Sequence, residues 1–219
     1  MATVARRTLS QRVPIVLVFG ESTNDSRSVV RLIEALCPEL KGRVKARSTP
    51  PSLQRSASSQ AVYSWTDRIA DVVQADRRPI ACVFVHRDSD APDPAGLLQT
   101  ETEAALLAAG MTDAHAVVPI QEIESWWMLF PDATEQVRIS WRRQLDRSRA
   151  DRDAVPNPKE DLSRRTGRVS RRDAYSAADS PRVAERVAAA IEAGTHPTGV
   201  SRSFERFRES VSECCKKVS

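Results

Sequence analysis

Apolar residues occur along the chain in short unbroken runs, separated by longer segments in which apolar positions recur every three or four residues. The runs at residues 13–19 and 80–85 are rich in β-branched side chains and are followed within two residues by charged ones. Such runs are typical of strands buried on both faces of a parallel sheet. Residues 116–120 form a similar run, whose Pro119 predicts a place at the sheet edge or at a strand end. Residues 43–48 are a weaker strand candidate.

Helical periodicity fills the segments between these runs. A first helix is predicted between the cap-forming residues 22–25 and Pro38, a second over residues 59–75, and a third over residues 95–109, ended by Gly110. The alternation of strands and helices predicts the α/β class, with a parallel sheet flanked by helices on both faces.

The composition changes after residue 131, which divides the chain into three parts. Residues 1–12 are polar and predict a poorly ordered lead-in, and residues 13–131 hold the α/β domain. Residues 132–219 predict a mostly helical, basic extension packed on that domain, with helical periodicity at residues 183–191 and 204–211.

Length and composition are those of an ordinary globular protein. With 219 residues, of which 41% are hydrophobic, the chain can bury one substantial core. No apolar run is long enough to cross a bilayer, and residues 13–19 are too short for a secretory signal, so we expect a cytoplasmic protein without a membrane partner. The four cysteines show no metal-binding spacing, so we expect reduced thiols.

Positive charge is concentrated in one segment. The formal net charge is +4, yet residues 138–172 hold twelve Lys or Arg against five Asp or Glu, an excess of seven, so the remainder is net acidic. A basic segment beside an acidic site suits a polyanion whose backbone is handled by metal. A solvated, arginine-rich helix would explain the same charge without any ligand.

Carboxylates follow three of the predicted strands: Glu21, then Asp88 and Asp90, then Glu122 and Glu124. The carboxyl ends of parallel strands meet at one edge of the sheet, where open α/β proteins place their chemistry. Clustered carboxylates repel one another, and a hard divalent cation such as Mg²⁺ would neutralise them. One acidic pair could simply solvate a loop, but three acidic strand ends are a rarer coincidence. Asp25, in the first turn of the first helix, is explained equally well by capping.

These motifs resemble the Toprim fold, the catalytic domain of topoisomerases, primases and the overcoming-lysogenization-defect (OLD) family of nucleases. The resemblance rests on Glu21 after the first strand and on Asp88 and Asp90 after the third. The Toprim glutamate is commonly followed by glycine and a second acid. Here Gly20 precedes Glu21, and Asp25 takes the place of the second acid.

A second resemblance covers more of the chain. Residues 119–129 are similar to the signature of a bacterial family of unknown function that is regarded as Toprim-like. The segments at residues 156–159 and 203–207 are similar to tail motifs of that family. The likeness runs from about residue 13 onward and implies a Toprim-like or Rossmann-like parallel sheet.

The resemblance implies cleavage of phosphodiester bonds with Mg²⁺ or Mn²⁺, with two ions about 4 Å apart. The implied ligands are six acids: Glu21, Asp25, Asp88, Asp90, Glu122 and Glu124. Glu21 would be the acid–base or metal-bridging group. The two aspartates after the third strand would bind one ion, and the two glutamates after the fourth are candidates for the second. Lys159 would neutralise charge on the phosphorane, although a solvated loop lysine is an equally simple explanation.

Five basic residues are candidate contacts to nucleic acid: Arg87, Arg142, Arg143, Arg164 and Arg165. Arg87 adjoins the acids together with His86, where it could hold a phosphate or pair with the acids. The resemblance implies a role in prokaryotic antiviral defence on DNA more than on RNA. Such proteins often act beside an ATPase, and this chain has no phosphate-binding loop of its own, so we expect an ATPase partner. Apolar faces on the C-terminal helices would also suit a homodimer.

Two other hypotheses remain open. The chain could be a catalytically degenerate Toprim-like module that binds a partner and keeps its acids for structural metal. It could also be another Mg²⁺-dependent phosphotransfer enzyme, such as a phosphatase or nucleotidyltransferase. An aspartyl phosphatase would place its Asp-x-Asp pair after the first strand, where this chain has Glu21.

Overall fold

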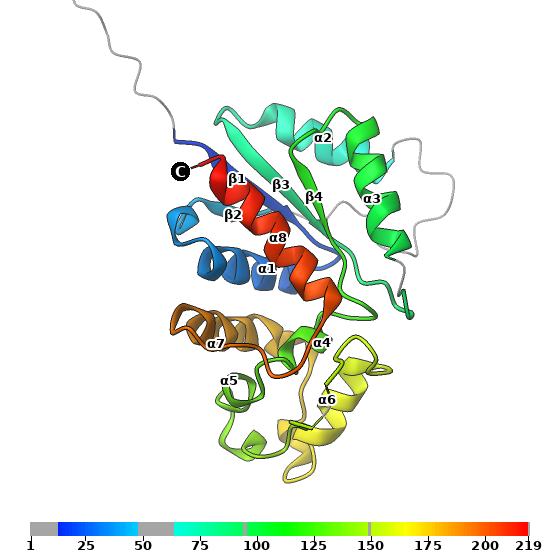
Figure 1. Ribbon diagram of the computed structural model, residues 1–219, viewed down its shortest axis with the longest axis vertical. Coiled ribbons are helices and arrows are strands. Elements are labelled where there is room, and N and C mark those ends of the chain that lie inside the picture. The colour runs from blue at the N-terminus through cyan, green and yellow to red at the C-terminus, as the bar shows by residue number, and fades with distance from the viewer. Residues whose placement is uncertain (1–12, 48–63, 94–95, 149, 219) are drawn as a thin grey trace, which may run out of the picture.

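The computed structural model describes residues 13–47, 64–93, 96–148 and 150–218. Its centre is a four-stranded, all-parallel sheet with the order β2-β1-β3-β4 (Figure 1). The strands are β1 (Ile15–Phe19), β2 (Val44–Ala46), β3 (Ile80–His86) and β4 (Ala114–Val117). The predicted α/β class with a parallel sheet is confirmed. The predicted lead-in at residues 1–12 lies outside the described residues.

The outer position of β4 agrees with the prediction from Pro119. The strand begins two residues earlier than predicted and ends before Val118, so Pro119 lies in the loop that follows. A proline there removes no donor from the ladder between β3 and β4.

Helices cover both faces of the sheet, and the side chains of each strand alternate between them. Leu17 and Phe19 of β1 face α2 (Trp65–Ala75) and α3 (Leu97–Ala108). Val16 and Val18 face α1 (Thr23–Leu36) and α8 (Arg202–Lys216), which cover the other face (Figure 1). The central strands are therefore buried on both sides, as their unbroken apolar runs predict.

The helix boundaries follow local capping chemistry. Ser22 and Asp25 form a reciprocal capping box at the start of α1, and Ser64 with Asp67 does the same for α2. The second helix was predicted from residue 59 but begins at Trp65 with Ser64 as its cap; residues 59–63 lie outside the described residues.

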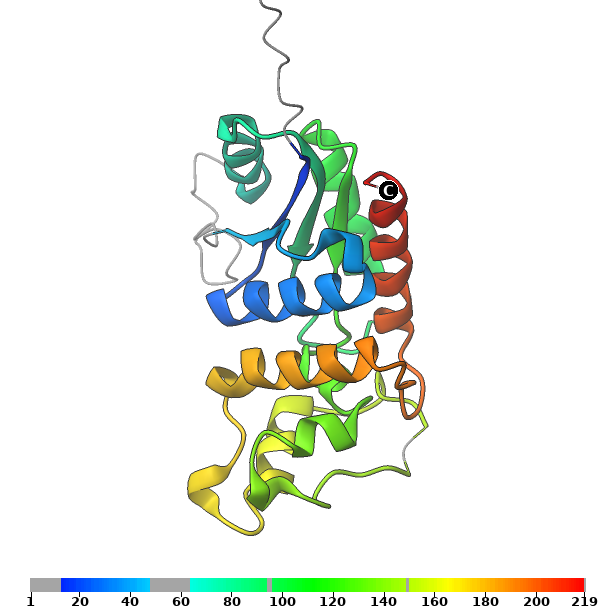
Figure 2. The same cartoon turned by 90° about the vertical axis from the view of Figure 1, so that its left-hand side faces the viewer.

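From residue 124 onward the chain forms three short helices, two long helices and several 3₁₀ turns. The helices before α8 are α4 (Glu124–Trp127), α5 (Pro131–Glu135), α6 (Pro158–Thr166) and α7 (Ser180–Glu192). The 3₁₀ turns of the described chain are η1 (Pro38–Leu40), η3 (Ile139–Trp141), η4 (Arg171–Asp173) and η5 (Ala177–Asp179). Helix α7 lies along α1, so that α1 is sandwiched between the sheet and α7 (Figure 2). The two predicted C-terminal helices are confirmed as α7 and α8.

The extension shares one hydrophobic core with the sheet. Trp126, Trp141 and Leu162 belong to the same buried cluster as Val16 of β1. Helix α8 returns from the extension to the sheet, where Phe207 stacks on Trp126 with ring centroids 5.1 Å apart. The last helix of the chain is therefore part of the covering layer of the sheet.

A buried arginine and an aspartate fix the entry into α8. Arg152 is 1% exposed, and its guanidinium donates to the carbonyl oxygens of Asp146 and Thr198. Asp153 accepts hydrogen bonds from the hydroxyl of Ser201 and the backbone N–H of Arg202. Asp153 thus satisfies a backbone donor at the start of α8 that a helix leaves unpaired, and Arg152 holds the two segments that precede the helix.

Two disulfides attach α8 to the sheet layer, so the expectation of four reduced thiols is wrong for this structure. Cys215 is bonded to Cys37 at the end of α1, and Cys214 to Cys82 in β3. The partners are 178 and 132 residues apart, so local spacing gave no sign of them. Closing a loop of such length removes chain entropy from the unfolded state equivalent to about 4 kcal/mol or more.

The longest helix of the described chain, α8, has 15 residues. No helix in the described ranges has both the length and the apolar composition that a bilayer span requires.

Candidate functional site at the carboxyl edge of the sheet

The strand order creates a switch point between β1 and β3. From β1 the chain moves outward to β2 on one side, whereas β3 is followed by β4 on the other. In open α/β sheets the loops diverge at such a point and leave a crevice beyond the carboxyl ends of the two strands. Glu21 follows β1 and Asp88 follows β3, so both acids lie at this position.

Glu21 is placed by a tight turn from β1 into α1. A side chain at Gly20 would put its Cβ only 2.8 Å from the backbone nitrogen of Ser26, so glycine allows this close approach. Partial burial and the negative charges of Asp88 and Asp90 raise the pKa of Glu21 to about 7, although His86 and Arg87 lower it. The first and third strand ends are therefore within electrostatic reach of each other.

Asp88 connects the loop after β3 to the loop after β4. Its Oδ1 accepts a hydrogen bond of 3.1 Å from the backbone N–H of Ile123 and lies 3.3 Å from Nε2 of His86. Both of these contacts are made by Oδ1 of Asp88. Neither of them uses Oδ2.

His86 is a buried imidazole beside the acids. It is fully buried at the end of β3, and neither of its ring nitrogens has a hydrogen-bond partner among the described residues. Burial lowers the pKa of His86, but the negative charges of Asp88, Asp25 and Glu21 outweigh it and raise the pKa to about 9. A protonated imidazole would offset part of the acidic charge.

Gln121 links three loops around the site, and sequence reasoning missed this role. Its backbone N–H donates to Oγ of Ser89 at 2.6 Å, and its carbonyl accepts from the N–H of Asp90 at 2.9 Å. Its side-chain amide donates to the carbonyl of Val155 and accepts from the N–H of Asn157, each at 2.9 Å. Gln121 has a φ of +63°, a conformation that nothing in its residue type signals.

Glu122 meets the start of α6. Its Oε2 accepts a 2.9 Å hydrogen bond from the backbone N–H of Lys159. Burial raises the pKa of Glu122, with smaller contributions from Asp88 and Asp90, whereas Lys159 lowers it. The lysine nominated from sequence is therefore beside the acidic edge, with an exposed side chain.

Glu124 is the most deeply buried of these acids, at 3% exposure. The hydroxyl of Tyr175 donates to its Oε1 at 2.9 Å. Burial, reinforced by the charge of Asp88, raises the pKa of Glu124 to about 7. Tyr175 was not a candidate from sequence, because its partner lies 51 residues earlier in the chain.

The other predicted residues near this edge have structural contacts. Asp25 accepts the N–H of Ser22 at 2.9 Å and so acts as a helix cap. Asp90 is exposed, with a φ of +50°. Arg87 lies over the ring of Trp65, 5.5 Å from its centroid, and its charge also acts on Glu21.

The acids are near one another without forming a closed cage. No three of them offer oxygen atoms that all lie within 4.8 Å of one another; within the described ranges such a group occurs only at Cys37, Glu39 and Cys215. Glu21 and Asp88 lie at the switch point, and Glu122 and Glu124 follow β4, the next strand of the sheet.

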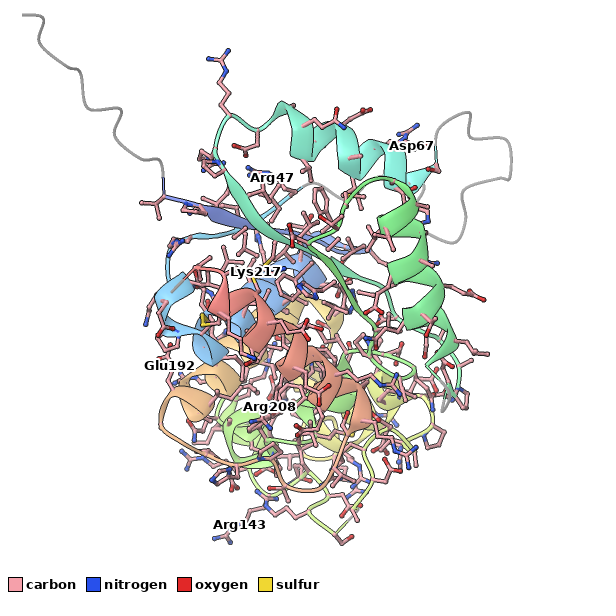
Figure 3. The ribbon with its side chains drawn as sticks, turned by 45° about the horizontal axis from the view of Figure 1, so that its top comes forward. Arg47, Asp67, Arg143, Glu192, Arg208 and Lys217 are labelled. Atoms are coloured by element: carbon pink, nitrogen blue, oxygen red, sulfur yellow. A yellow bond between two sulfur atoms is a disulfide. The ribbon has the colours of Figure 1, made fainter. Side chains whose placement is uncertain are left out.

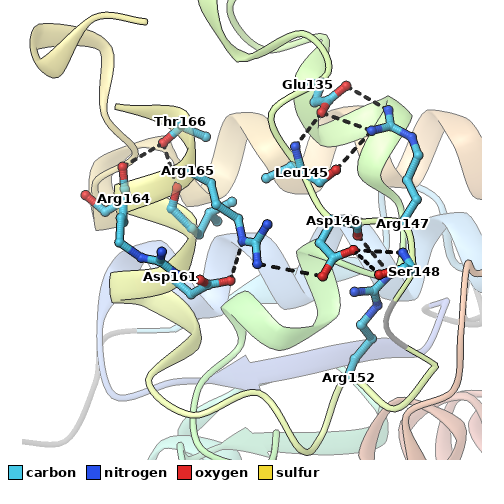
Figure 4. Close-up of polar contacts among 12 residues, drawn as sticks. Glu135, Leu145, Asp146, Arg147, Ser148, Arg152, Asp161, Arg164, Arg165 and Thr166 are labelled. Atoms are coloured by element: carbon cyan, nitrogen blue, oxygen red, sulfur yellow. Dashed lines mark hydrogen bonds and ion pairs between the residues drawn. The ribbon is translucent and has the colours of Figure 1, made fainter. Parts of the chain in front are cut away.

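Besides Arg87, the arginines predicted to contact nucleic acid divide into two pairs. Arg164 and Arg165 on α6 are both ion-paired with Asp161, and Arg165 also lies 3.7 Å from Asp146 (Figure 4). They line a hollow of about 410 Å³ that also includes Asn157.

Arg142 and Arg143 lie elsewhere, beside a hollow of about 460 Å³ that also includes Glu135 and Arg147. Both are exposed, and Figure 3 shows Arg143 pointing outward at the end of the molecule opposite Asp67 of α2.

Fold and site define an α/β protein with carboxylates at the switch point of a four-stranded parallel sheet. Comparison with family models, with curated proteins and with solved structures finds no match to this chain. The Toprim-like relationship therefore stays a prediction from the sequence motifs.

Proposed function

We propose that this protein is a metal-dependent nuclease that cleaves phosphodiester bonds of nucleic acid, DNA in preference to RNA. The observation that carries the proposal is the position of Glu21, whose pKa is raised to about 7 by burial and by Asp88 and Asp90. Acids held together at the switch point of a sheet, against their mutual repulsion, are characteristic of functional sites.

The donor set is chemically suited to Mg²⁺ or Mn²⁺, which prefer carboxylate oxygens. Glu21, Asp88 and Asp90 would hold one ion, and Glu122 and Glu124 would contribute to a second. The raised pKa values of Glu21 and Glu124 indicate acids short of positive charge, which a cation would supply. A bound ion of this class activates water and stabilises charge on a phosphate.

The chain's own residues have complementary roles. Glu21 would bridge the ions or accept a proton from water, and a bound ion would lower its pKa from the metal-free value of about 7. His86 balances the charge of Asp88 and holds its Oδ1 in place. Lys159 and Arg87 would bind the phosphate backbone beside the acids.

The wider setting rests on the family resemblance. It supports a cytoplasmic protein of a prokaryotic antiviral system, working with an ATPase partner, and a homodimer is compatible with it. Disulfides are rare in reducing compartments, so the cytoplasmic assignment requires Cys37, Cys82, Cys214 and Cys215 to be reduced there.

A second candidate is a non-catalytic, partner-binding module. It is favoured by the number of acids with structural hydrogen bonds: Asp25 caps α1, Asp88 accepts the N–H of Ile123, and Glu124 accepts the hydroxyl of Tyr175. Another Mg²⁺-dependent phosphotransfer enzyme is a third candidate, disfavoured by Glu21 in the place of an aspartyl nucleophile.

The test is cleavage of plasmid and of single-stranded oligonucleotides with Mg²⁺, with Mn²⁺ and with a chelator. We expect Glu21→Gln and Asp88→Asn to lose about 100-fold or more in rate, because each removes a charge from the site but preserves size. Glu101→Gln, an exposed acid on α3, is the matched control.

The outcomes separate the three candidates. Metal binding without cleavage, in the presence of the partner, would favour the module. Release of phosphate from small esters or nucleotides would favour the phosphotransfer enzyme. Equal activity in Glu21→Gln and Glu101→Gln would contradict the proposed site.

A further inference from the structure

A second group of potential metal ligands lies away from the acidic edge. Cys37 ends α1, Glu39 lies in the following turn η1, and Cys215 lies in the last turn of α8. Helix α1 separates this group from the acidic edge by its 14 residues, a length of about 20 Å. The group is therefore independent of the proposed nuclease site.

The geometry of the group is unusual for a simple disulfide. Oε2 of Glu39 lies 3.4 Å from the sulfur of Cys37 and 3.4 Å from the sulfur of Cys215. The two sulfurs are bonded to each other, so neither has a proton to donate to the carboxylate. A negative oxygen placed equally close to both sulfurs gains no hydrogen bond from them in this state.

The same three atoms form a suitable ligand set once the disulfide is reduced. Zinc binds thiolate sulfur at about 2.3 Å and carboxylate oxygen at about 2.0 Å in tetrahedral sites, which places a sulfur and an oxygen on one ion about 3.5 Å apart. The observed separations of 3.4 Å are close to this value for both cysteines. The two sulfurs are bonded in the oxidised state and would move to about 3.7 Å apart on a tetrahedral ion after reduction. Two thiolates and one carboxylate leave a fourth position for water.

We propose that Cys37, Glu39 and Cys215 form a redox-gated site for a thiophilic divalent cation of the zinc class. Two electrons from a dithiol reductant break the sulfur–sulfur bond, giving two thiols and the oxidised reductant. Binding of the ion then releases the two thiol protons to solvent and forms two metal–sulfur bonds and one metal–oxygen bond. In a reducing compartment, cysteines brought together in this way are more often metal ligands than disulfides.

The two disulfides differ in access. Cys215 is half-buried although its partner Cys37 is fully buried, whereas Cys82 and Cys214 are both fully buried. A reductant therefore reaches the bond between Cys37 and Cys215 first, while that between Cys82 and Cys214 keeps α8 attached to β3. The ion would replace the first bond as a link between α8 and the end of α1.

The experiment is a titration of the full chain with Cd²⁺ after reduction by a phosphine, which converts the disulfide and one water to two thiols and a phosphine oxide. Ultraviolet absorption reports thiolate-to-cadmium charge transfer. We expect the band to saturate at one equivalent in reduced protein and to be absent in oxidised protein, with Zn²⁺ competing for the same site.

Variants assign the ligands. Cys37→Ser and Cys215→Ser should lose the band, and Glu39→Gln, an exposed position that preserves the fold, should bind at least about tenfold more weakly. Glu213→Gln, exposed near the end of α8, is the charge-matched control and should bind as the native chain does. The double variant Cys82→Ser/Cys214→Ser should retain the band.

The proposal would be overturned if reduced, folded protein gives no band, or if Glu39→Gln and Glu213→Gln bind equally well. It would also be overturned if binding is lost in Cys82→Ser/Cys214→Ser while circular dichroism shows native helix content.

Discussion

The acids at the carboxyl edge of the sheet and the acids of the helical extension are both partly or fully buried, yet their surroundings shift their pKa values in opposite directions. At the sheet edge, burial raises the pKa of Glu21 and Glu124 to about 7. In the extension, the pKa of Glu135 and that of Asp146 are lowered.

The difference comes from the number of donors supplied to each acid. Burial acts to raise the pKa of Glu135 too, but Arg147 and the backbone N–H of Leu145 donate to it (Figure 4). The backbone N–H of Arg143 also donates to Glu135, and the three donors together outweigh burial. Glu124 has a comparable burial and accepts from the hydroxyl of Tyr175.

This contrast separates structural acids from candidate functional ones. An acid that accepts hydrogen bonds from several donors stabilises the fold and needs no further explanation. Acids that lie near one another with few donors lower stability, and binding of a ligand or catalysis of a reaction best explains their presence.

The sharpest test makes the same substitution in both regions. Glu135→Gln removes a charge that Arg147 and two N–H groups require, so the free energy of unfolding should fall by about 2 kcal/mol at pH 8. Glu124→Gln keeps an oxygen that can accept from Tyr175 and removes a buried charge. The free energy of unfolding of this variant should therefore rise by about 1 kcal/mol. Urea denaturation measures both. A loss of stability in Glu124→Gln equal to that in Glu135→Gln would break the distinction.

The two regions should also respond to pH with opposite sign. Glu124 has a pKa of about 7 in place of 4.5, so the folded state holds its proton more tightly and stability falls as pH rises from 4.5 to 7. His86, raised from 6.5 to about 9, contributes stability below pH 6.5 that is lost as pH rises through 9. The lowered pKa values of Glu135 and Asp146 give stability that is lost only as pH falls below their ordinary values.

Denaturation at a series of pH values checks these signs. Glu124→Gln should flatten the decline in the free energy of unfolding between pH 4.5 and 7 by about 3 kcal/mol and leave the loss of stability below pH 4 unchanged. Stability that increases between pH 5 and 7 in the native chain, and is unaffected by this variant, would show that the sheet-edge acids are as well compensated as those of the extension.

The smallest expected effect is on DNA binding by two pairs of arginines. Arg142 and Arg143 are exposed, whereas Arg164 and Arg165 are paired with acids. Arg142→Gln/Arg143→Gln should weaken binding to DNA several-fold and reduce the slope of its salt dependence by about two. Arg164→Gln/Arg165→Gln should have less effect, because Asp161 and Asp146 neutralise these guanidinium groups in the fold. Fluorescence anisotropy over a salt series compares the two variants, and the reverse order would contradict the assignment.

The sheet and its covering helices could be predicted because their signals are local. The apolar run of β3 and the caps of α1 lie within a few neighbouring residues, and the parallel arrangement follows from the alternation of strands and helices. The grouping of Glu21 with Asp88 followed from the same alternation, since adjacent parallel strands end at one edge of the sheet.

The remaining features of the site depend on contacts between distant parts of the chain. The pKa of His86 is raised by its sequence neighbour Asp88 and also by Asp25 and Glu21, which only the fold brings near it. Gln121 takes a left-handed conformation to connect three loops, and neither its residue type nor its neighbours in sequence signal this.

The amino-acid sequence by itself thus determined the α/β class, most helix positions and the location of the acids at strand ends, because periodicity and capping act over short distances. Only the tertiary structure decided which acids keep a donor partner, which arginines are neutralised and how the cysteines pair over 178 and 132 residues. The physical reason is that the burial of a side chain and the charges around it depend on which segments contact one another. Those contacts are fixed only by the packing of the whole chain.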